Sequence, residues 1–293
     1  MNMKRLIALA LALVLSLALA ACGSGAAPSP SASAPAESSA APAESAPAES
    51  ASAESDLDYV KGKGALVIGY TVYAPMNYTD DNGEFTGFDT ELAEAVCEKL
   101  GVEPQFQEIV WETKEIELAS KTIDCIWNGM TLDPEREANM ACTVPYVKNA
   151  QVVVMKADAD YADTSSLIGK SVCAEVGSAG ETQILGNEET KPDANLAQAD
   201  YVGKSVQTDC LMEVAAGTCD AAVLDMTLAN AMIGEGTDYA GLKIVDELAV
   251  ENYGVAFRQG SDVRDAVNEI FAEVVADGSL GALADKYGLE LAD

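Results

Sequence analysis

Between residues 65 and 128, short apolar runs alternate with stretches in which apolar side chains recur every three or four positions. The runs are short and rich in β-branched and aromatic residues, so we expect buried strands. The periodic stretches predict amphipathic helices, the first of them capped by Asp89 and ended by Gly101. The expected order is strand 65–70, helix 90–100, strand 104–110, helix 114–120 and strand 123–128. This alternation predicts a parallel sheet with helices on both faces.

A second unit of the same kind follows the first. Its pattern again alternates apolar runs with helical periodicity, so the chain is predicted to be an α/β protein with two similar units. We expect strands at 151–156, 171–176, 219–225, 242–245 and 252–257, and helices at 208–216, 226–233, 263–276 and 280–287.

Three polar segments come directly after predicted strands: residues 128–136, residues 177–180 and Asp225. Ligands of open α/β sheets bind beyond the carboxyl ends of the strands. One segment belongs to the first unit and two belong to the second. A ligand that contacts all three must therefore lie between the units.

The segment Asn128-Gly129-Met130-Thr131-Leu132-Asp133-Pro134-Glu135-Arg136 has the most specific chemistry. A strand end, backbone N–H groups, a hydroxyl and a guanidinium together make a receptor for a carboxylate, which arginine binds with two parallel hydrogen bonds. Taken alone, so short a motif favours a surface loop in which Arg136 pairs with Glu135 or Glu137. The other segments reverse that preference.

Residues 1–22 predict a targeting signal. Lys4 and Arg5 precede an apolar run from Leu6 to Ala20, which is too short for a stable membrane-spanning helix. The run ends in Leu19-Ala20-Ala21-Cys22, which is similar to the lipobox of a bacterial lipoprotein, where the cysteine is lipidated and becomes the new N-terminus. The alternative is an ordinary secretory signal with an incidental cysteine.

Residues 23–55 contain only Gly, Ser, Ala, Pro and Glu. Without large apolar side chains, such a segment cannot bury enough surface to offset the entropy of ordering it. We therefore expect a solvated tether that holds the folded part away from a membrane.

Charge and composition exclude several classes of function. The formal net charge of −31 argues against nucleic acid and anionic membrane surfaces as partners. The chain has no histidine, which excludes Ser-His-Asp and Cys-His catalysis and His-ligated metals. No pair of cysteines has the CxxC spacing, and we expect no metal and no cofactor.

Six of the seven cysteines follow Cys22, an even number that permits disulfides outside the cytoplasm. Cys210 and Cys219 flank a short link between a helix and a strand and are the pair best placed for a bridge. Several of the others lie in apolar segments, where a free cysteine packs as a small hydrophobic residue. The six are Cys97, Cys125, Cys142, Cys173, Cys210 and Cys219.

From about residue 63 to residue 289 the chain resembles the family-3 extracellular solute-binding proteins, the polar amino acid receptors of ABC importers. The most specific parts of the resemblance are Gly87-Phe88-Asp89 and the spacing from Thr131 to Arg136. Each motif is weak singly, and the ordered set is strong. The others are Tyr73-Ala74-Pro75-Met76, Gly83-Glu84-Phe85-Thr86, Thr143-Val144-Pro145-Tyr146, Leu167-Ile168-Gly169-Lys170, Gly177-Ser178, Gly217-Thr218-Cys219-Asp220-Ala221 and Ala276-Asp277-Gly278-Ser279.

The resemblance implies a type II periplasmic-binding-protein-like fold, with two α/β lobes joined by two crossing strands. Lobe 1 would comprise residues 56–148 and 251–293, and lobe 2 residues 149–250. The ligand would lie in the cleft between the lobes, which close over it.

The resemblance also implies a set of ligand contacts. Arg136 would bind the α-carboxylate of an amino acid, with the N–H groups of Thr131 and Ser178. Asp225 would bind the α-ammonium, with Gly129 and the Thr131 hydroxyl. The side chain would be enclosed by Tyr73 and Trp111 and read at its end by Asn128 and Tyr70. For Asp225 the alternative role is the N-cap of the following helix, and for Tyr73 and Trp111 it is core packing.

The loop from Tyr70 to Tyr73 lacks the acidic residue that receptors for cationic amino acids carry there, so we expect a polar, non-cationic ligand. The expected function is a monomeric, lipid-anchored binding protein on the outer face of the cell membrane, without catalytic residues, that delivers a free amino acid to an ABC permease. The alternatives are a dehydratase-like enzyme with the same fold, which needs an acid or base in the cleft, and a receptor that reports the ligand to a sensor.

Overall fold

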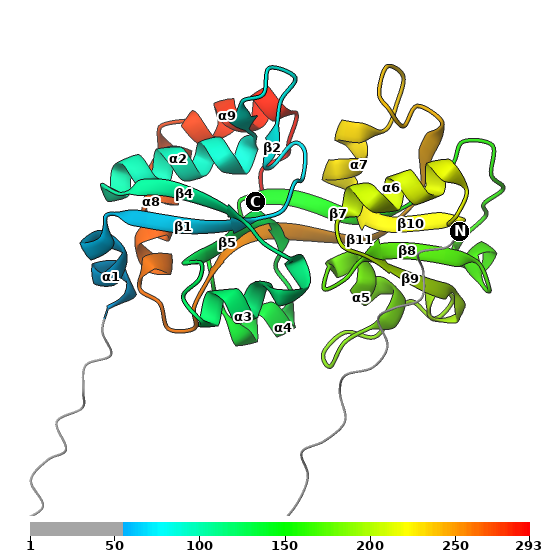
Figure 1. Ribbon diagram of the computed structural model, residues 1–293, viewed down its shortest axis with the longest axis horizontal. Helices are drawn as coiled ribbons and strands as arrows, with labels where there is room; N and C mark the ends of the chain where they lie inside the picture. Colours follow the sequence, from blue (N-terminus) through cyan, green and yellow to red (C-terminus); the bar gives the residue numbers. More distant parts are fainter. Residues whose placement is uncertain (1–54) are drawn as a thin grey trace, which may run out of the picture. The chain divides into compact units, whose positions relative to one another are not determined.

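The computed structural model describes residues 55–293, which belong to a single unit (Figure 1). The predicted signal peptide with Cys22, and the predicted tether apart from Ser55, lie outside the described residues. Ser55 itself caps the first helix, because its hydroxyl accepts a hydrogen bond from the Asp58 N–H at 3.0 Å. It also donates to Asp262 at 2.6 Å.

One mixed sheet runs through the described part of the chain in the order β4-β1-β5-β11-β7-β10-β8-β9, with β6 paired to β11. A separate hairpin is formed by β2 and β3. The strands are β1 (Ala65–Tyr70), β2 (Tyr78–Thr79), β3 (Phe85–Thr86), β4 (Glu103–Glu108), β5 (Cys125–Thr131), β6 (Ala141–Cys142), β7 (Val147–Lys156), β8 (Ser171–Glu175), β9 (Asp200–Lys204), β10 (Ala221–Asp225) and β11 (Leu242–Phe257).

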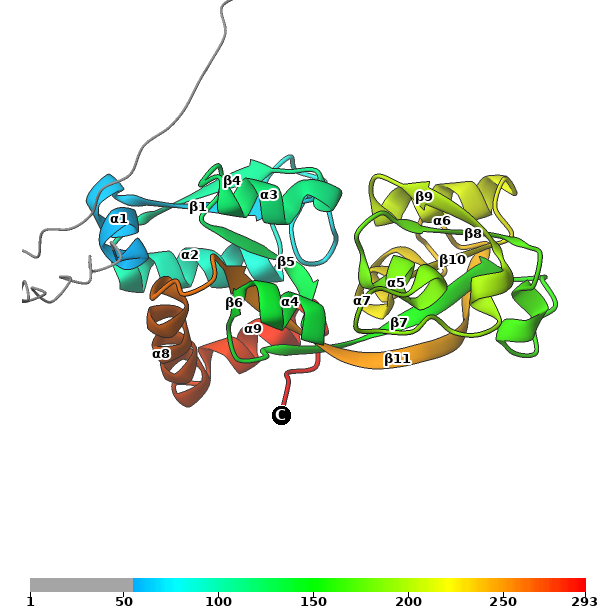
Figure 2. The ribbon, with the colours of Figure 1, turned by 90° about the horizontal axis from the view of Figure 1, so that it is seen from below.

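Helices cover both faces of this sheet, as the alternating pattern predicted (Figures 1 and 2). On the side of β4, β1 and β5, α2 and α9 lie on one face and α3 and α4 on the other. The α-helices are α1 (Asp56–Lys63), α2 (Phe88–Leu100), α3 (Lys114–Ala119), α4 (Pro134–Asn139), α5 (Ala179–Leu185), α6 (Gln207–Ala216), α7 (Met226–Met232), α8 (Val263–Ala276) and α9 (Ser279–Tyr287). The 3-10 helices are η1 (Trp111–Thr113), η2 (Thr164–Leu167) and η3 (Leu196–Gln198).

The long strands β7 and β11 pair antiparallel and join two lobes (Figure 2). On one side of them, β1 pairs parallel with β4 and β5. On the other side, β8 pairs parallel with β9 and β10. The predicted parallel order therefore holds inside each lobe, whereas the two strands that connect the lobes are antiparallel to their neighbours.

The separate strands expected at 242–245 and 252–257 are wrong, because β11 is continuous over both. Its pairing with β7 shifts register twice, between Ile244 and Asp246 and between Glu247 and Ala249. Each irregularity reverses which side chains face the core, so the alternation of apolar residues breaks while the backbone stays extended.

Strands β5 and β7 are also longer than the sequence pattern predicted. β5 continues through Thr131, and β7 begins at Val147. Most of the added residues are polar or small, such as Gly129, Thr131 and Asn149, so the continuous apolar run is shorter than the strand. The helix at 90–100 begins at Phe88, and its N-cap is Gly87. The assignment of Asp89 as the cap is therefore wrong.

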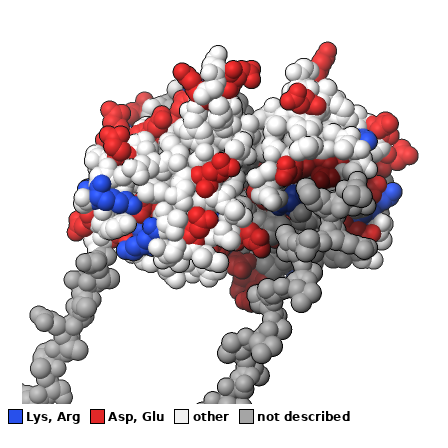
Figure 3. All heavy atoms as spheres, viewed as in Figure 1, with Lys and Arg blue, Asp and Glu red and all other residues white. Residues whose placement is uncertain are grey.

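All six cysteines in the described residues are free thiols, so the bridge considered between Cys210 and Cys219 is absent there. Within residues 55–293 no group of three or more acidic or cysteine side chains is placed to hold a metal ion. No helix in this range has both the length and the apolar character needed to cross a membrane. Acidic side chains outnumber basic ones on the face of the molecule drawn in Figure 3.

Candidate functional site

The turn between β5 and α4 sets the position of Arg136. Asp133 caps α4 by accepting the Arg136 N–H at 2.8 Å, and Pro134 occupies the first helical turn. This local geometry places Arg136 in the first turn of the helix, with its guanidinium directed back at Thr131 of β5. The side chain is buried, with 6% of its surface exposed.

Each nitrogen of the Arg136 guanidinium has a partner. Nη1 donates to the Thr131 carbonyl at 2.9 Å, and Nη2 donates to the Gly177 carbonyl at 3.1 Å. Nε lies 3.2 Å from Asp133. Neither Glu135 nor Glu137 pairs with Arg136 in the described structure. The alternative of a surface loop in which Arg136 pairs with one of these glutamates is therefore wrong. Because Gly177 lies beyond β8 in the other lobe, this guanidinium bridges the lobes.

Gly129 lies near the end of β5 in a left-handed backbone conformation. Its φ is +56°, a conformation that favours glycine, and a Cβ there would approach the Tyr73 ring to 2.7 Å. The Gly129 N–H donates to Asp89 at 2.6 Å, and the Tyr146 hydroxyl donates to the other Asp89 oxygen at 2.8 Å. Burial, only partly offset by these hydrogen bonds, raises the pKa of Asp89 to about 7. Asp89 therefore anchors the strand end.

Asp225 is the last residue of β10 and is 5% exposed. It occupies the N-cap position of α7, yet its side chain makes no capping hydrogen bond. Instead one carboxylate oxygen accepts from the amides of Asn149 and Gln151, each at 2.6 Å, and the other accepts from the Gln207 amide. Burial raises the pKa of Asp225 above its ordinary value. In residues 55–293 no cationic side chain pairs with it.

A second carboxylate, Glu251, shares these partners. Its Oε1 accepts from Asn149 at 2.7 Å, from Gln151 at 2.8 Å and from the Thr131 hydroxyl at 2.7 Å. Burial and the neighbouring Asp225 raise the pKa of Glu251 to about 7. Two acids therefore lie behind one edge of the cleft, bridged by neutral amides.

The loop after β8 forms the facing wall. Ser178 caps α5, because its hydroxyl accepts from the Glu181 N–H at 3.1 Å. The Glu181 carboxylate in turn accepts the N–H of Gly177, the residue before the cap, at 2.7 Å. The Gly177 carbonyl is then free to accept from the opposite lobe.

Lys114 is a second lobe-1 cation that reaches this carbonyl. Its Nζ lies 3.0 Å from the Gly177 oxygen, 3.3 Å from the Trp111 oxygen and 4.9 Å from the centre of the Trp111 ring. Burial, together with the nearby Arg136, lowers the pKa of Lys114 to about 8. Lys114 and Arg136 therefore both hold the β8 loop against lobe 1.

The two aromatic residues expected to enclose a ligand side chain are buried and line the cavity. Tyr73 shares a hydroxyl hydrogen bond with Tyr253, and Trp111 packs with the apolar side chains around Ile126. Each therefore contributes to the core and to the cavity wall at once. Tyr70 does not line the cavity, because its ring packs on Phe85 at 4.8 Å.

One cavity brings together eight of the nine residues expected from the sequence, all except Tyr70. Three further residues line it that were not expected from the sequence: Glu175, Ala179 and Gln207. Glu175 ends β8 as Asp225 ends β10, so the same rule about strand ends applied to it. The full lining is Tyr73, Trp111, Asn128, Gly129, Thr131, Arg136, Glu175, Ser178, Ala179, Gln207 and Asp225.

The free volume among these side chains is about 10 Å³, which is room for about one water molecule. The structure is thus a closed form. An amino acid is far larger than this space, so the lobes must separate before one can enter.

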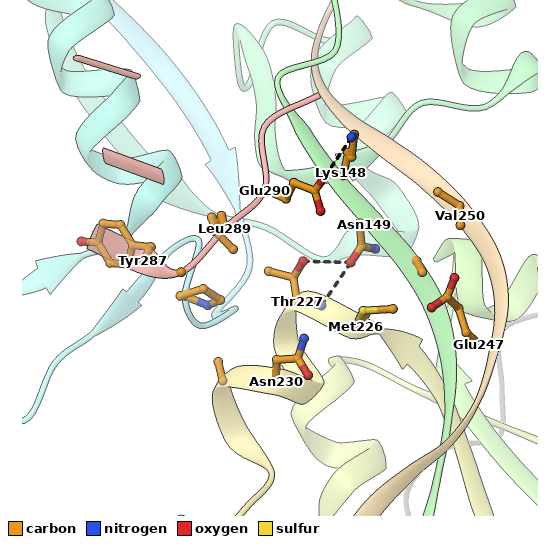
Figure 4. A pocket seen from close by; sticks show the side chains of 14 residues that line it. Lys148, Asn149, Met226, Thr227, Asn230, Glu247, Val250, Tyr287, Leu289 and Glu290 are labelled. Atoms are coloured by element: carbon orange, nitrogen blue, oxygen red, sulfur yellow. Dashed lines mark hydrogen bonds and ion pairs between the residues drawn. The ribbon is translucent and has the colours of Figure 1, made fainter. Parts of the chain in front are cut away.

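A larger cavity of about 600 Å³ lies beside β7, between α7 and the segment that follows α9 (Figure 4). Its polar groups are paired or exposed: Lys148 pairs with Glu290 at 2.8 Å, and the side-chain amide oxygen of Asn149 accepts from the Thr227 hydroxyl at 2.8 Å. No pair of buried opposite charges faces this cavity. The smaller cavity therefore has the chemistry of a specific polar site, and the larger one does not.

The chain is similar to known proteins over most of its described residues. A sequence model of the bacterial extracellular solute-binding proteins, family 3, matches residues 66–290. The arginine-binding extracellular protein ArtP of Bacillus subtilis (strain 168) is 28% identical over 228 residues, which cover 77% of this chain and 87% of that protein.

Two solved structures illustrate the similarity in fold. An ABC uptake transporter substrate-binding protein from Streptococcus pneumoniae with bound histidine has a TM-score of 0.71 and 28% identity, covering 80% of this chain and 96% of that one. The ancestral amino acid-binding protein AncCDT-1, a precursor of cyclohexadienyl dehydratase, has a TM-score of 0.69 and 28% identity, covering 80% and 99%.

Proposed function

This chain belongs to family 3 of the bacterial extracellular solute-binding proteins, and on that premise we propose that it captures a free polar amino acid outside the cytoplasm and delivers it to the permease of an ABC importer. Its fold is the expected type II fold, with two α/β lobes joined by two crossing strands. Curated relatives include amino acid-binding proteins, among them receptors named for arginine and histidine.

The observation that carries the proposal is the pair of buried, opposite charges in one cavity. Arg136 comes from lobe 1 and Asp225 from lobe 2. Moving a zwitterion out of water costs free energy unless each of its charges is paired and hydrogen-bonded. A cation and an anion on opposite walls meet that requirement for the α-carboxylate and the α-ammonium.

Neighbouring groups complete the two ends of this receptor. When the ligand binds, Arg136 would exchange its bond to the Gly177 carbonyl for the ligand carboxylate. The N–H groups of Thr131 and Ser178 would also donate to that carboxylate, Ser178 in place of its bond to the Glu175 carbonyl at 3.2 Å. The Thr131 hydroxyl donates to Glu251, so its lone pairs stay available for the ligand ammonium beside Asp225 and the Gly129 carbonyl.

Tyr73 and Trp111 would enclose the ligand side chain. Asn128 is the remaining expected contact, although its amide already donates to Thr71 at 2.8 Å and accepts from Asn77 at 2.9 Å. It therefore keeps one N–H for the ligand. Tyr70 is left out of the proposed site because its ring packs on β3 instead.

The division of the chain also remains part of the proposal. We place lobe 1 at residues 56–148 and 251–293 and lobe 2 at 149–250, because β7 and β11 cross between the two halves of the sheet near these points. Residues 1–22 would direct export and lipidation of Cys22, and residues 23–55 would tether a monomeric receptor to the outer face of the membrane. If Cys22→Ser leaves the amount of protein in the membrane fraction unchanged, the lipid anchor is refuted.

We withdraw the restriction to a non-cationic ligand. It rested on the missing acidic residue between Tyr70 and Tyr73. The cavity has a buried acid in Glu175 instead, supplied by the other lobe. Relatives are named for ligands of both classes, among them cationic arginine and uncharged cystine.

A panel of the twenty amino acids in a thermal-shift assay tests the proposal. At least one amino acid should raise the unfolding temperature, and calorimetry should then give one binding site per chain. Recovering the bound amino acid unchanged after prolonged incubation distinguishes a receptor from a dehydratase-like enzyme. If no amino acid shifts the transition, or the bound one is converted, the proposed function is wrong.

A further inference from the structure

Glu175 is a buried acid without a partner for one of its oxygens. It ends β8, is 3% exposed and lines the cavity that contains Arg136 and Asp225. Its Oε1 is buried and has no hydrogen-bond partner in residues 55–293, and no lysine or arginine of this range forms an ion pair with it. A buried acceptor left unsatisfied costs folding free energy, so a ligand that supplies a donor there gains affinity.

The two cations nearest to Glu175 are committed to other acceptors. Lys114 donates to the carbonyls of Trp111 and Gly177. Arg136 donates to the carbonyls of Thr131 and Gly177 and pairs with Asp133. Neither cation therefore neutralises Glu175 in the closed form.

Asp225, the other acid in the cavity, already accepts three amide hydrogen bonds, whereas Glu175 is available for a new contact. In the proposed function Arg136 and Asp225 grip the two ends of the amino acid backbone. The side chain of the ligand is then the part that is left to reach Glu175.

The charges around the cavity also favour a cation. When their carboxyl groups are ionised, Glu175, Asp225 and Glu251 carry three negative charges against the two positive charges of Arg136 and Lys114, and Arg136 is already paired to Asp133. A zwitterion adds no net charge to this set. A ligand with one further positive charge brings it closer to neutrality, which lowers the cost of burying the charges.

Resting on the proposed function, we propose that Glu175 is the specificity-determining residue of the site and that the ligand is an amino acid whose side chain ends in a positively charged hydrogen-bond donor. Glu175 accepts that donor through its buried Oε1. The ligand thus bridges both lobes at three points: Arg136, Asp225 and Glu175.

The protonation state of Glu175 supports this role and makes it measurable through the pH dependence of ligand binding. Burial first, and then the charge of Asp225, raise the pKa of Glu175 to about 8, against the opposing effects of Lys114, the Gln207 amide and Arg136. Near pH 7 the free protein therefore holds a proton on Glu175. A cationic side chain stabilises the carboxylate, so binding releases that proton and affinity rises with pH below about 8.

The test compares pairs of ligands that differ in side-chain charge and little in shape: arginine with citrulline, and lysine with norleucine. Calorimetric titrations use the wild-type chain, Glu175→Gln and the control Glu235→Gln, an exposed glutamate in the same lobe. In the wild type and the control, at least one cationic ligand should bind about 30-fold or more tightly than its neutral analogue. In Glu175→Gln this preference should shrink to within about threefold, and neutral analogues should bind as they do to the wild type.

A second measurement follows the proton. Titrations at pH 7 in buffers of different ionisation enthalpy should show proton release when the cationic ligand binds to the wild type. Glu175→Gln should show less release.

The outcomes separate this inference from the proposed function. If a neutral or acidic amino acid binds as tightly as any cationic one, or if Glu175→Gln keeps the preference, the role of Glu175 is refuted while the receptor function stands. If no amino acid binds at all, both are refuted.

Discussion

Replacing Asp225 by asparagine removes the negative charge that is proposed to bind the α-ammonium of the ligand. Asparagine has nearly the same shape, and its carbonyl oxygen can still accept the amides of Asn149 and Gln151, which now share one Asp225 oxygen at 2.6 Å each. Only the Gln207 side-chain amide must rotate, because it now donates to the Asp225 oxygen that asparagine replaces with an NH2 group. The variant should therefore fold and lose the negative charge alone.

The size of the effect follows from burial. Asp225 is 5% exposed, and its three donors are neutral amides, so a ligand ammonium would be its first cationic partner. Two unit charges about 4 Å apart attract by about 4 kcal/mol at an effective dielectric constant of about 20. Truncating one member of a buried charge pair typically costs about 2–5 kcal/mol, or roughly 30- to 5000-fold in affinity.

A cycle of two proteins and two ligands measures this interaction directly. Wild type and Asp225→Asn are each titrated with the tightest-binding amino acid and with its analogue that lacks the α-ammonium. The coupling between the two changes should be about 2–5 kcal/mol. Asp238→Asn, at an exposed site of the same lobe, should leave both affinities unchanged. A coupling below about 0.7 kcal/mol, or threefold in affinity, would refute the assignment of Asp225.

Three further predictions concern other parts of the chain. Lys114→Met removes the hydrogen bond to the Gly177 carbonyl at 3.0 Å and should weaken ligand binding about tenfold, because this bond holds only the closed form; unchanged affinity in calorimetry would contradict the role of Lys114. The free energy of unfolding should fall as the pH rises from 4 towards 7, because Asp89 has a pKa of about 7 when folded and 3.8 as its reference value, and so keeps its proton longer in the folded state. Urea titrations of Asp89→Asn should show a smaller slope in that window, and an equal slope would count against the burial effect. A chain that starts at Asp56 should bind with the affinity of one that starts at Cys22, and a tenfold loss would contradict the tether.

The sequence predicted the elements whose apolar side chains face the core along their whole length, because the hydrophobic pattern there follows the secondary structure. Helix α8 was expected at its observed bounds, because its apolar stripe faces the core along the whole helix. The strands that cross between the lobes were predicted poorly. They carry polar residues where they pass between the lobes, such as Asn149 on β7 and Glu251 on β11, and the register shifts in β11 hide its alternation. In these strands the polar residues between the lobes interrupt the hydrophobic pattern.

The candidate site shows the same division. Arg136 and Asp225 were expected because each lies at or just beyond the end of a predicted strand. Their side chains carry opposite charges, as the two ends of an amino acid do. Glu175 also ends a strand, yet a glutamate before Gly177-Ser178 reads in the sequence as one more surface acid among many. Glu175 is nevertheless buried, in a cavity lined by residues that are distant in the sequence, among them Trp111 and Gln207, and no local pattern encodes that arrangement.

The central claim is that Arg136 binds the carboxylate of an amino acid in the interlobe cleft. The most direct test is calorimetric titration of the tightest-binding amino acid into wild type, Arg136→Ala and Arg136→Lys, with Arg264→Ala on α8 as the matched control. Arg136→Ala should lose about 30-fold or more in affinity. Arg136→Lys should lose nearly as much, because an ammonium cannot form the two parallel bonds, and the control should bind as the wild type does. If folded Arg136→Ala still binds within about threefold of the wild type, the site is elsewhere and the account fails.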